Sequence, residues 1–340
     1  MICPKTYAIT RDNNILEVSE LGTLTEIITI VKEIPESHLD ETLEKIKEIK
    51  ERADSKKEAI NSRCPHCNSQ KIVRNGHKHR KQAYLCRDCN KSFVTTTQSA
   101  IQKSHSSSTV WKQVIRDTIN GVAIAETAET LELHHETVFN MRHKILYCIE
   151  QSLIATPTEL TGVCEADETY VLESVKGRTI PEDYHRKPRK HGAVASKRGI
   201  SSEYVCVCTS VTGKGENVAV AVNRATPSSQ EILEVFGERV SEGTVVLCDG
   251  NQSYGILEDK CTVATTKRIN RVNGFHSFIK ERLDAARGVA TIYLNRYNAL
   301  FSKIYAADNS VVDDIFELMT SQTGSSNTIS HSQSVNLLNV

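Results

Sequence analysis

The chain has 340 residues, and its 42 Lys and Arg are balanced by 42 Asp and Glu, so its formal net charge is zero. This length allows two or three domains, and a neutral total charge by itself neither favours nor excludes a nucleic-acid partner. The sequence contains no apolar run of about eighteen residues and does not begin like a signal peptide, which excludes a predicted membrane span and favours a cytoplasmic protein.

The first part of the chain, residues 1–60, is acidic, with thirteen Asp and Glu against nine Lys and Arg. Residues 37–60 are predicted to form a charged helix with one apolar stripe. The stripe consists of Leu39, Leu43, Ile46 and Ile49. About two heptads are too few to predict a coiled coil, so we expect a packed surface helix.

Two Cys-x2-Cys pairs follow, separated by eighteen residues. Each pair can direct two sulfurs at one ion, which is the spacing of a structural Zn²⁺ site. The segment between the pairs is typical of two short strands around a basic turn. Residues 61–105 are therefore predicted to form a zinc ribbon. Its ligands would be Cys64, Cys67, Cys86 and Cys89.

The charge of the predicted ribbon is strongly positive, because residues 61–105 hold nine Lys and Arg and a single acid, Asp88. A rigid basic surface suits contacts with phosphates, so we expect double-stranded DNA as a partner. The alternative is a zinc site that only stabilises a small fold, with the charge serving solubility.

Residues 106–150 are predicted to be a helix-turn-helix. Ala128 lies where close helix packing needs a small residue, while Glu132 occupies a turn position more often held by glycine. Apolar side chains fill the remaining helix positions at Leu131, Leu133, Val138 and Met141.

The second helix of this pair has a predicted recognition face. At about 100° per residue, Val138, Ile145 and Ile149 face inward. The residues predicted to face outward and contact DNA are Asn140, His143 and Lys144. An ordinary helical hairpin with a solvated polar face is the alternative.

Residues 158–305 alternate between strand-like and helix-like segments, and two aspartates stand at informative positions. Asp167 lies in the strand-like segment GVCEADETYVL, and Asp249 ends the short apolar run TVVLCDG. A carboxylate at the end of a buried strand stands at a sheet edge where ligands gather.

The segment NRVNGFHSFIKERL is predicted to be a helix, with Ile279 and Leu283 on its buried stripe. Asn273 and Lys280 then lie two turns apart on one line beside that stripe. Phosphodiester chemistry with two Mg²⁺ or Mn²⁺ ions needs oxygen ligands from separate elements. Asp167, Asp249 and Asn273 could supply them, although such a set can also be chosen by chance from 42 acids.

The order of ribbon, helix-turn-helix, DETYV strand, CDG strand end and NRVNGFHSFIK helix resembles bacterial insertion-sequence transposases with an RNase H-like catalytic core. The resemblance covers roughly residues 61–305, and the predicted fold is a multidomain mixed α/β protein. It is most similar to the subgroup whose third acidic position is often asparagine, followed by lysine.

By position, the resemblance implies that Asp167 and Asp249 are the two catalytic aspartates and that Lys280 is the trailing lysine. Asn273 stands where many relatives have glutamate, and His276 departs from the tryptophan common in relatives. The implied activity is metal-dependent cleavage at the terminal inverted repeats, followed by transfer of the free 3′-hydroxyl into target DNA. A homo-oligomer on nucleoid DNA is implied as well.

Residues 174–200 form a basic insert with eight Lys and Arg. We expect this insert to bind DNA beside the catalytic site, while a solvated loop is the alternative. The candidate DNA contacts are Lys187, Arg189 and Lys190. Residues 306–340 are predicted to be a short helix and a polar tail.

Two other functions remain possible from the sequence. One is a DNA-binding regulator with an inactive core, and the other is an RNase H-like nuclease that cuts without joining.

Overall fold

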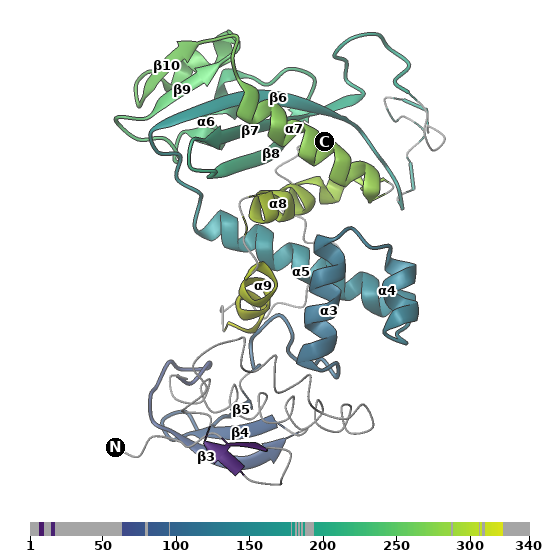
Figure 1. Ribbon diagram of the computed structural model, residues 1–340, viewed down its shortest axis with the longest axis vertical. Helices are drawn as coiled ribbons and strands as arrows, with labels where there is room; N and C mark the ends of the chain where they lie inside the picture. The colour runs from purple at the N-terminus through teal and green to yellow at the C-terminus, as the bar shows by residue number, and fades with distance from the viewer. Residues whose placement is uncertain are drawn as a thin grey trace. The chain divides into compact units, whose positions relative to one another are not determined.

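The computed structural model forms two compact units, residues 1–95 and 96–340. The structure describes residues 7–9, 15–17, 63–78, 81–94, 96–177, 179–180, 182, 184, 186–187, 194–286, 288–305, 307 and 310–321. The predicted helix over residues 37–60 and the tail after residue 321 lie outside these ranges. Figure 1 labels most of the elements described below.

The first unit contains two small antiparallel sheets. One pairs β1 (Tyr7–Ile9) with β2 (Ile15–Glu17). The other has the order β3-β4-β5, in which β3 and β4 form the hairpin predicted between the two cysteine pairs. Its strands are β3 (Ile72–Lys78), β4 (Lys81–Cys86) and β5 (Ser92–Val94).

The second unit begins with three helices. The hydroxyl of Ser107 accepts a hydrogen bond from the N–H of Val110 and so caps the first helix. Trp111 is 1% exposed on that helix, which packs against the other long helix of this group and against a helix near the end of the chain. These elements are α3 (Ser108–Ile119), α4 (Ile124–Thr130), α5 (His135–Ala155) and α9 (Val311–Thr320).

A mixed five-stranded sheet forms the centre of the second unit, with the order β10-β9-β6-β7-β8. The first three strands in the chain pair antiparallel, and the last two continue the sheet parallel to β6. The strands are β6 (Val163–Leu172), β7 (Tyr204–Thr212), β8 (Asn217–Arg224), β9 (Val245–Cys248) and β10 (Thr262–Thr265).

Both faces of this sheet are covered, because β7 alternates apolar side chains between two cores. Val205 and Val207 belong to the core shared with α3, α5, α7, α8 and α9, while Cys206 and Cys208 belong to the core shared with α6 and η2. Figure 1 shows α7 lying across the sheet beside α8. The covering elements are α6 (Ser229–Phe236), η2 (Gln252–Leu257), α7 (Asn270–Ala285), η3 (Thr291–Tyr293) and α8 (Leu294–Tyr305).

Helix α5 takes part in both the helical group and the sheet region. In its first half, Arg142 donates a hydrogen bond to the carbonyl of Val122, just before α4, at 2.8 Å. Near its end, Glu150 pairs with Arg296 of α8 at 3.4 Å, and α8 packs against β8. One continuous helix therefore connects the predicted helix-turn-helix to the layer that covers the sheet.

Candidate active site and metal centre

The four predicted zinc ligands lie together in the structure. The sulfurs of Cys64 and Cys89 are 3.6 Å apart, those of Cys67 and Cys86 are 3.5 Å apart, and all four lie within 4.8 Å of one another. A tetrahedral site with Zn–S bonds of about 2.3 Å requires sulfurs about 3.8 Å apart. The cluster therefore fits a Cys₄ zinc site of the predicted zinc-ribbon type.

Each cysteine pair turns in the same way, and an asparagine makes the turn. Asn68 and Asn90 have φ values of 60° and 55°, and their N–H groups bond back to Cys64 and Cys86 at 2.8 and 3.0 Å. Asparagine tolerates this left-handed conformation better than most residues. Backbone N–H groups of Cys89 and Asp88 lower the pKa of the Cys86 thiol to about 6, whereas burial and the neighbouring sulfurs raise the pKa of Cys67 to about 12.

A tight turn at Glu132 joins α4 and α5, the two helices of the candidate helix-turn-helix. Glu132 adopts φ 53° in the turn between α4 and α5, the left-handed position at which glycine is usual. The next N–H, of Leu133, bonds to the carbonyl of Ala128 at 2.9 Å, and Ala128 is only 7% exposed. Val138 is fully buried, as predicted for the inner face of the second helix.

The predicted outer face of α5 needs one correction. Asn140 is exposed and Lys144 is half-buried, but His143 is only 5% exposed. Its ring packs between Phe139 and Tyr293, with centroids 4.3 and 4.4 Å away. The helical wheel missed this because Tyr293 comes from η3, 150 residues further along the chain. His143 is thus a packing residue in this structure.

Strand pairing brings the two aspartates of the candidate catalytic site to neighbouring strands. Glu165 of β6 lies opposite Leu247 of β9 in a parallel register, and Asp167 and Asp249 each follow two residues later in their own segments. The charge of Asp249 acts on the Asp167 carboxyl. Adjacent strands are about 4.8 Å apart. Val246 and Cys248 face the α6 side, so strand alternation continued by one residue predicts that Asp249 faces the α7 side, as Asp167 does.

Glu165 fixes the start of α7 against β6. Its carboxylate accepts hydrogen bonds from the N–H groups of Arg271 and Val272 at 2.6 and 3.2 Å, and pairs with the Arg271 guanidinium at 3.1 Å. The helix has no side-chain cap of its own from Ile269. Glu165 therefore takes that role from another element, which no motif in the sequence indicated.

A hydrogen-bond chain connects α7 to Asp167. Thr209 of β7 donates to the backbone carbonyl of Asp167 at 2.7 Å and lies 2.6 Å from Nε2 of His276. Both contacts are satisfied when Nε2 of His276 carries the proton and donates to Thr209. Burial and the charge of Lys280 lower the pKa of His276 to about 4, so the imidazole is neutral. Its Nδ1 atom lies 3.9 Å from the Asp167 carboxylate.

Asp167 lies in a half-buried and charged environment. Burial raises the pKa of its carboxyl to about 6, and the negative charge of Asp249 adds to this, while the N–H of Glu168 and the charge of Lys280 oppose it. Asn273 and Lys280 are exposed on α7, one turn before and one turn after His276. Asp167 therefore interacts with the charges of Asp249 and Lys280, and Asn273 lies on the helix whose His276 approaches Asp167.

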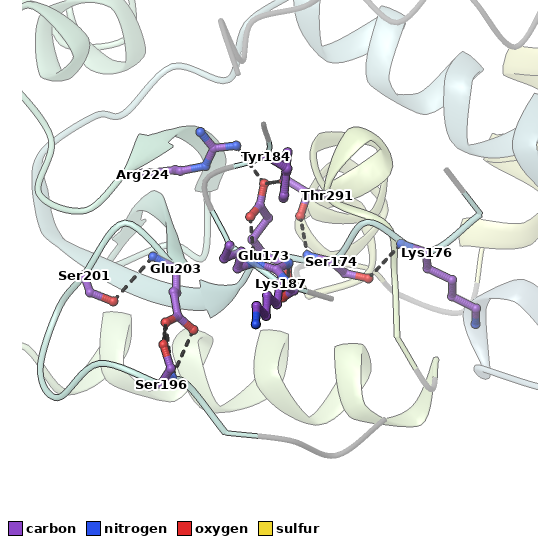
Figure 2. A network of polar contacts seen from close by, with 11 residues as sticks. Glu173, Ser174, Lys176, Tyr184, Lys187, Ser196, Ser201, Glu203, Arg224 and Thr291 are labelled. Atoms are coloured by element: carbon purple, nitrogen blue, oxygen red, sulfur yellow. Dashed lines mark hydrogen bonds and ion pairs between the residues drawn. The ribbon is translucent and has the colours of Figure 1, made fainter. Parts of the chain in front are cut away.

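A network of hydrogen bonds centred on Glu173 holds residues of the basic insert to the end of β6. Glu173, 4% exposed, accepts hydrogen bonds from Tyr184, from Nε of Arg186 at 3.1 Å and from Arg224 at 2.7 Å (Figure 2). Lys187, next to Arg186, is exposed. The other two predicted DNA contacts, Arg189 and Lys190, lie outside the described residues.

The chain is similar in sequence to a protein of an archaeal transposable element. That relative is the uncharacterized protein in transposable element ISH50 of Halobacterium salinarum, which is 26% identical over 199 residues. The match covers 58% of this chain and 64% of the relative. It confirms the predicted resemblance to proteins of mobile elements, although the relative is archaeal rather than bacterial. No family model matches the chain.

Two solved structures also show similarity. A pre-cleavage Mos1 transpososome has 12% identity and a TM-score of 0.27, covering 57% of this chain and 70% of that one. A Mos1 transposase paired-end complex with the left transposon end has 11% identity and a TM-score of 0.28, covering 58% and 70%. Both scores are below 0.5, so the fold of the second unit is defined here by its own strand order.

Among the helices in the part of the chain that the structure describes, none is long and apolar enough to cross a membrane.

Proposed function

We propose that this chain is a DNA transposase in which Asp167, Asp249 and Asn273 hold two divalent ions, Mg²⁺ or Mn²⁺. The observation that carries the proposal is the parallel pairing of β6 with β9, after which Asp167 and Asp249 follow in step, together with the effect of the Asp249 charge on the Asp167 carboxyl. The sequence similarity to a transposable-element protein supports the same function. Three antiparallel strands continued by two parallel ones support an RNase H-like core.

The side chains divide the chemistry between them. When bound, the two ions would activate the attacking oxygen and stabilise the charge that develops on the phosphate. Asp167, on the central strand, would serve both ions, Asp249 would serve one, and the amide oxygen of Asn273 would serve the other without adding negative charge. Lys280 would hold the phosphate from the next turns of α7.

Recognition of the terminal inverted repeats is assigned to the helical group and the zinc ribbon. Asn140 and Lys144 would contact DNA from α5, and His143 would support that helix from beneath through Phe139 and Tyr293. The basic insert would add phosphate contacts through Lys187, Arg189 and Lys190. We further propose that the protein acts as a homo-oligomer on double-stranded DNA of the nucleoid in the cytoplasm, because two element ends must be joined.

The test uses purified protein, Mg²⁺ or Mn²⁺, and labelled DNA carrying the repeats that flank the gene. Asp167→Ala is compared with the control Asp259→Ala. Asp259 is exposed and lies just before β10, whereas Asp249 lies just after β9, so the two aspartates are at opposite ends of these parallel strands. We expect cutting and joining by the wild type and by Asp259→Ala, and neither by Asp167→Ala.

Other outcomes separate the two alternatives. Cuts without joined products would identify a nuclease. Tight repeat binding without cutting in either metal would identify a regulator with an inactive core and would overturn the catalytic assignment.

A further inference from the structure

The basic insert has a second fixed point besides Glu173. Glu203, 3% exposed, lies just before β7, and its carboxylate accepts hydrogen bonds from the backbone N–H of Ser196 at 3.1 and 3.2 Å and from the Ser196 hydroxyl (Figure 2). The carbonyl of Glu203 accepts from the N–H of Glu173 at 2.9 Å. Two buried carboxylates thus hold both ends of the insert to the ends of β6 and β7.

The last seven residues of the insert, residues 194–200, are all described and are named here the insert tip. Val194 is 82% exposed and Ile200 is 56% exposed, the two highest values for large hydrophobic side chains among the described residues. Lys197 and Arg198 are also exposed, and Gly199 turns the chain with φ 77°. Two aliphatic side chains and two cations therefore occupy one short loop.

Such exposure has an energetic cost, since an aliphatic side chain left in water forgoes its burial free energy. The same loop could place polar residues at both positions without loss of any contact, because Ser196 alone makes the bonds to Glu203. The aliphatic pair is therefore expected to be covered by a partner, and the adjacent Lys197 and Arg198 indicate a partner with negative charge.

We propose that the insert tip is a DNA wedge: Lys197 and Arg198 bind phosphates while Val194 and Ile200 insert between bases and open a base step. This inference rests on the proposed function. Apolar side chains flanked by cations unstack base steps in this way when a protein bends DNA. The insert begins directly after Glu173, which follows β6 and lies six residues beyond Asp167, about 20 Å at about 3.3 Å per residue. The same length of duplex holds about six base pairs.

The experiment measures binding to a panel of duplexes of equal length that carry the flanking repeat. One duplex is intact, and each of the others has a single mismatch at successive steps beside the cleavage position. The variants are Val194→Ser with Ile200→Ser, Lys197→Ala with Arg198→Ala, and the control Val163→Ser. Val163 is a 46% exposed aliphatic residue at the start of β6, far along the strand from the insert.

A mismatch weakens base stacking, so a protein that inserts side chains between bases spends less free energy there and binds the mismatched duplex more tightly than the intact one. Wild type and Val163→Ser should prefer one mismatch position over the intact duplex by roughly tenfold. The Val194/Ile200 double variant should lose this preference and keep its affinity for intact DNA within about twofold. The Lys197/Arg198 double variant should keep the preference but lower the slope of log affinity against log salt by about 2.

Three results would overturn the wedge. An unchanged mismatch preference in the Val194/Ile200 variant, or no preference in the wild type, would show that the pair does not enter the stack. A change of self-association without a change in DNA preference would assign the tip to a protein contact. Failure of the wild type to bind any duplex would instead overturn the proposed function itself, so the two failures are distinguishable.

Discussion

Replacing Glu165 with Ala is expected to loosen α7 from β6 and displace Asn273 and Lys280 from Asp167. The carboxylate supplies two backbone acceptor bonds at the first turn of α7, a contribution comparable to a helix cap of about 1 kcal/mol. Its negative charge at a partly buried helix N-terminus adds up to about 2 kcal/mol. Arg271 is half exposed, so its ion pair adds only about 0.5 kcal/mol.

The expected loss in the free energy of unfolding is therefore about 3 kcal/mol for Glu165→Ala. Glu165→Gln keeps one acceptor oxygen and loses mainly the charge, so it should lose about 1–2 kcal/mol. Trp111 is the only tryptophan in the chain and is buried in the same unit, so its fluorescence during urea unfolding measures this change.

Glu231 provides the matched control, because it completes the capping box of α6 on the other face of the sheet. Glu231→Ala should cost about 1 kcal/mol and leave metal-dependent DNA cleavage unchanged. Glu165→Gln should reduce cleavage by about tenfold to a hundredfold, since a small displacement of ligands is costly in rate. The reasoning is refuted if Glu165→Ala loses no more stability than Glu231→Ala, or if Glu165→Gln cleaves DNA at the wild-type rate.

Three further predictions concern the metal centre and the acidic site. Cys67→Ser should abolish the binding of one Zn²⁺ per chain. It should not change the unfolding transition of Trp111, because the zinc ligands lie in residues 1–95 and Trp111 lies in residues 96–340. The control Cys261→Ser should still bind zinc, and metal analysis of both variants measures this. Asp167→Asn should raise the melting temperature of protein without Mg²⁺ at pH 7. The pKa of Asp167 is about 6 in the folded protein and 3.8 ordinarily, so its ionisation destabilises the fold as pH rises between these values. The wild type and the variant should therefore have the same stability below pH 4. A variant less stable than the wild type at pH 7 would contradict this. Thr209→Val should cost about 1–3 kcal/mol in urea unfolding by leaving the buried N–H of His276 without an acceptor, and Thr209→Ser, which keeps the hydroxyl, should lose less than half of that.

The parts of the fold that short-range patterns control could be predicted from the sequence. The two cysteine pairs predicted the sulfur cluster because each pair and its turn lie within five residues, and one short hairpin of β3 and β4 brings the two pairs together. The apolar run before Asp249 predicted a strand, although only Val246 and Cys248 of β9 are buried, and the spacing of Val272 and Ile279 predicted the buried face of α7. Each of these depends on residues that are neighbours in sequence.

What the sequence did not indicate depends on contacts between distant segments. The carboxylate of Glu165 caps a helix more than a hundred residues away, and Tyr293 covers the predicted outer face of α5 at His143. Period-2 alternation puts Glu165 and Asp167 on one face of β6, so a role for Glu165 could have been suspected. The partner that it binds follows only from the sheet order.

Helix α5 is held at two points along its length, by the bond from Arg142 to the carbonyl of Val122 and by the ion pair of Glu150 with Arg296 of α8. Because the helix is continuous over its 21 residues, the segment that carries Asn140 has a fixed angular phase relative to the sheet. One residue inserted near Ile145 would turn that segment by about 100° and advance it by about 1.5 Å. The length of this helix, more than the side chains at its surface, therefore sets the direction from which anything bound at its first turns approaches Asp167.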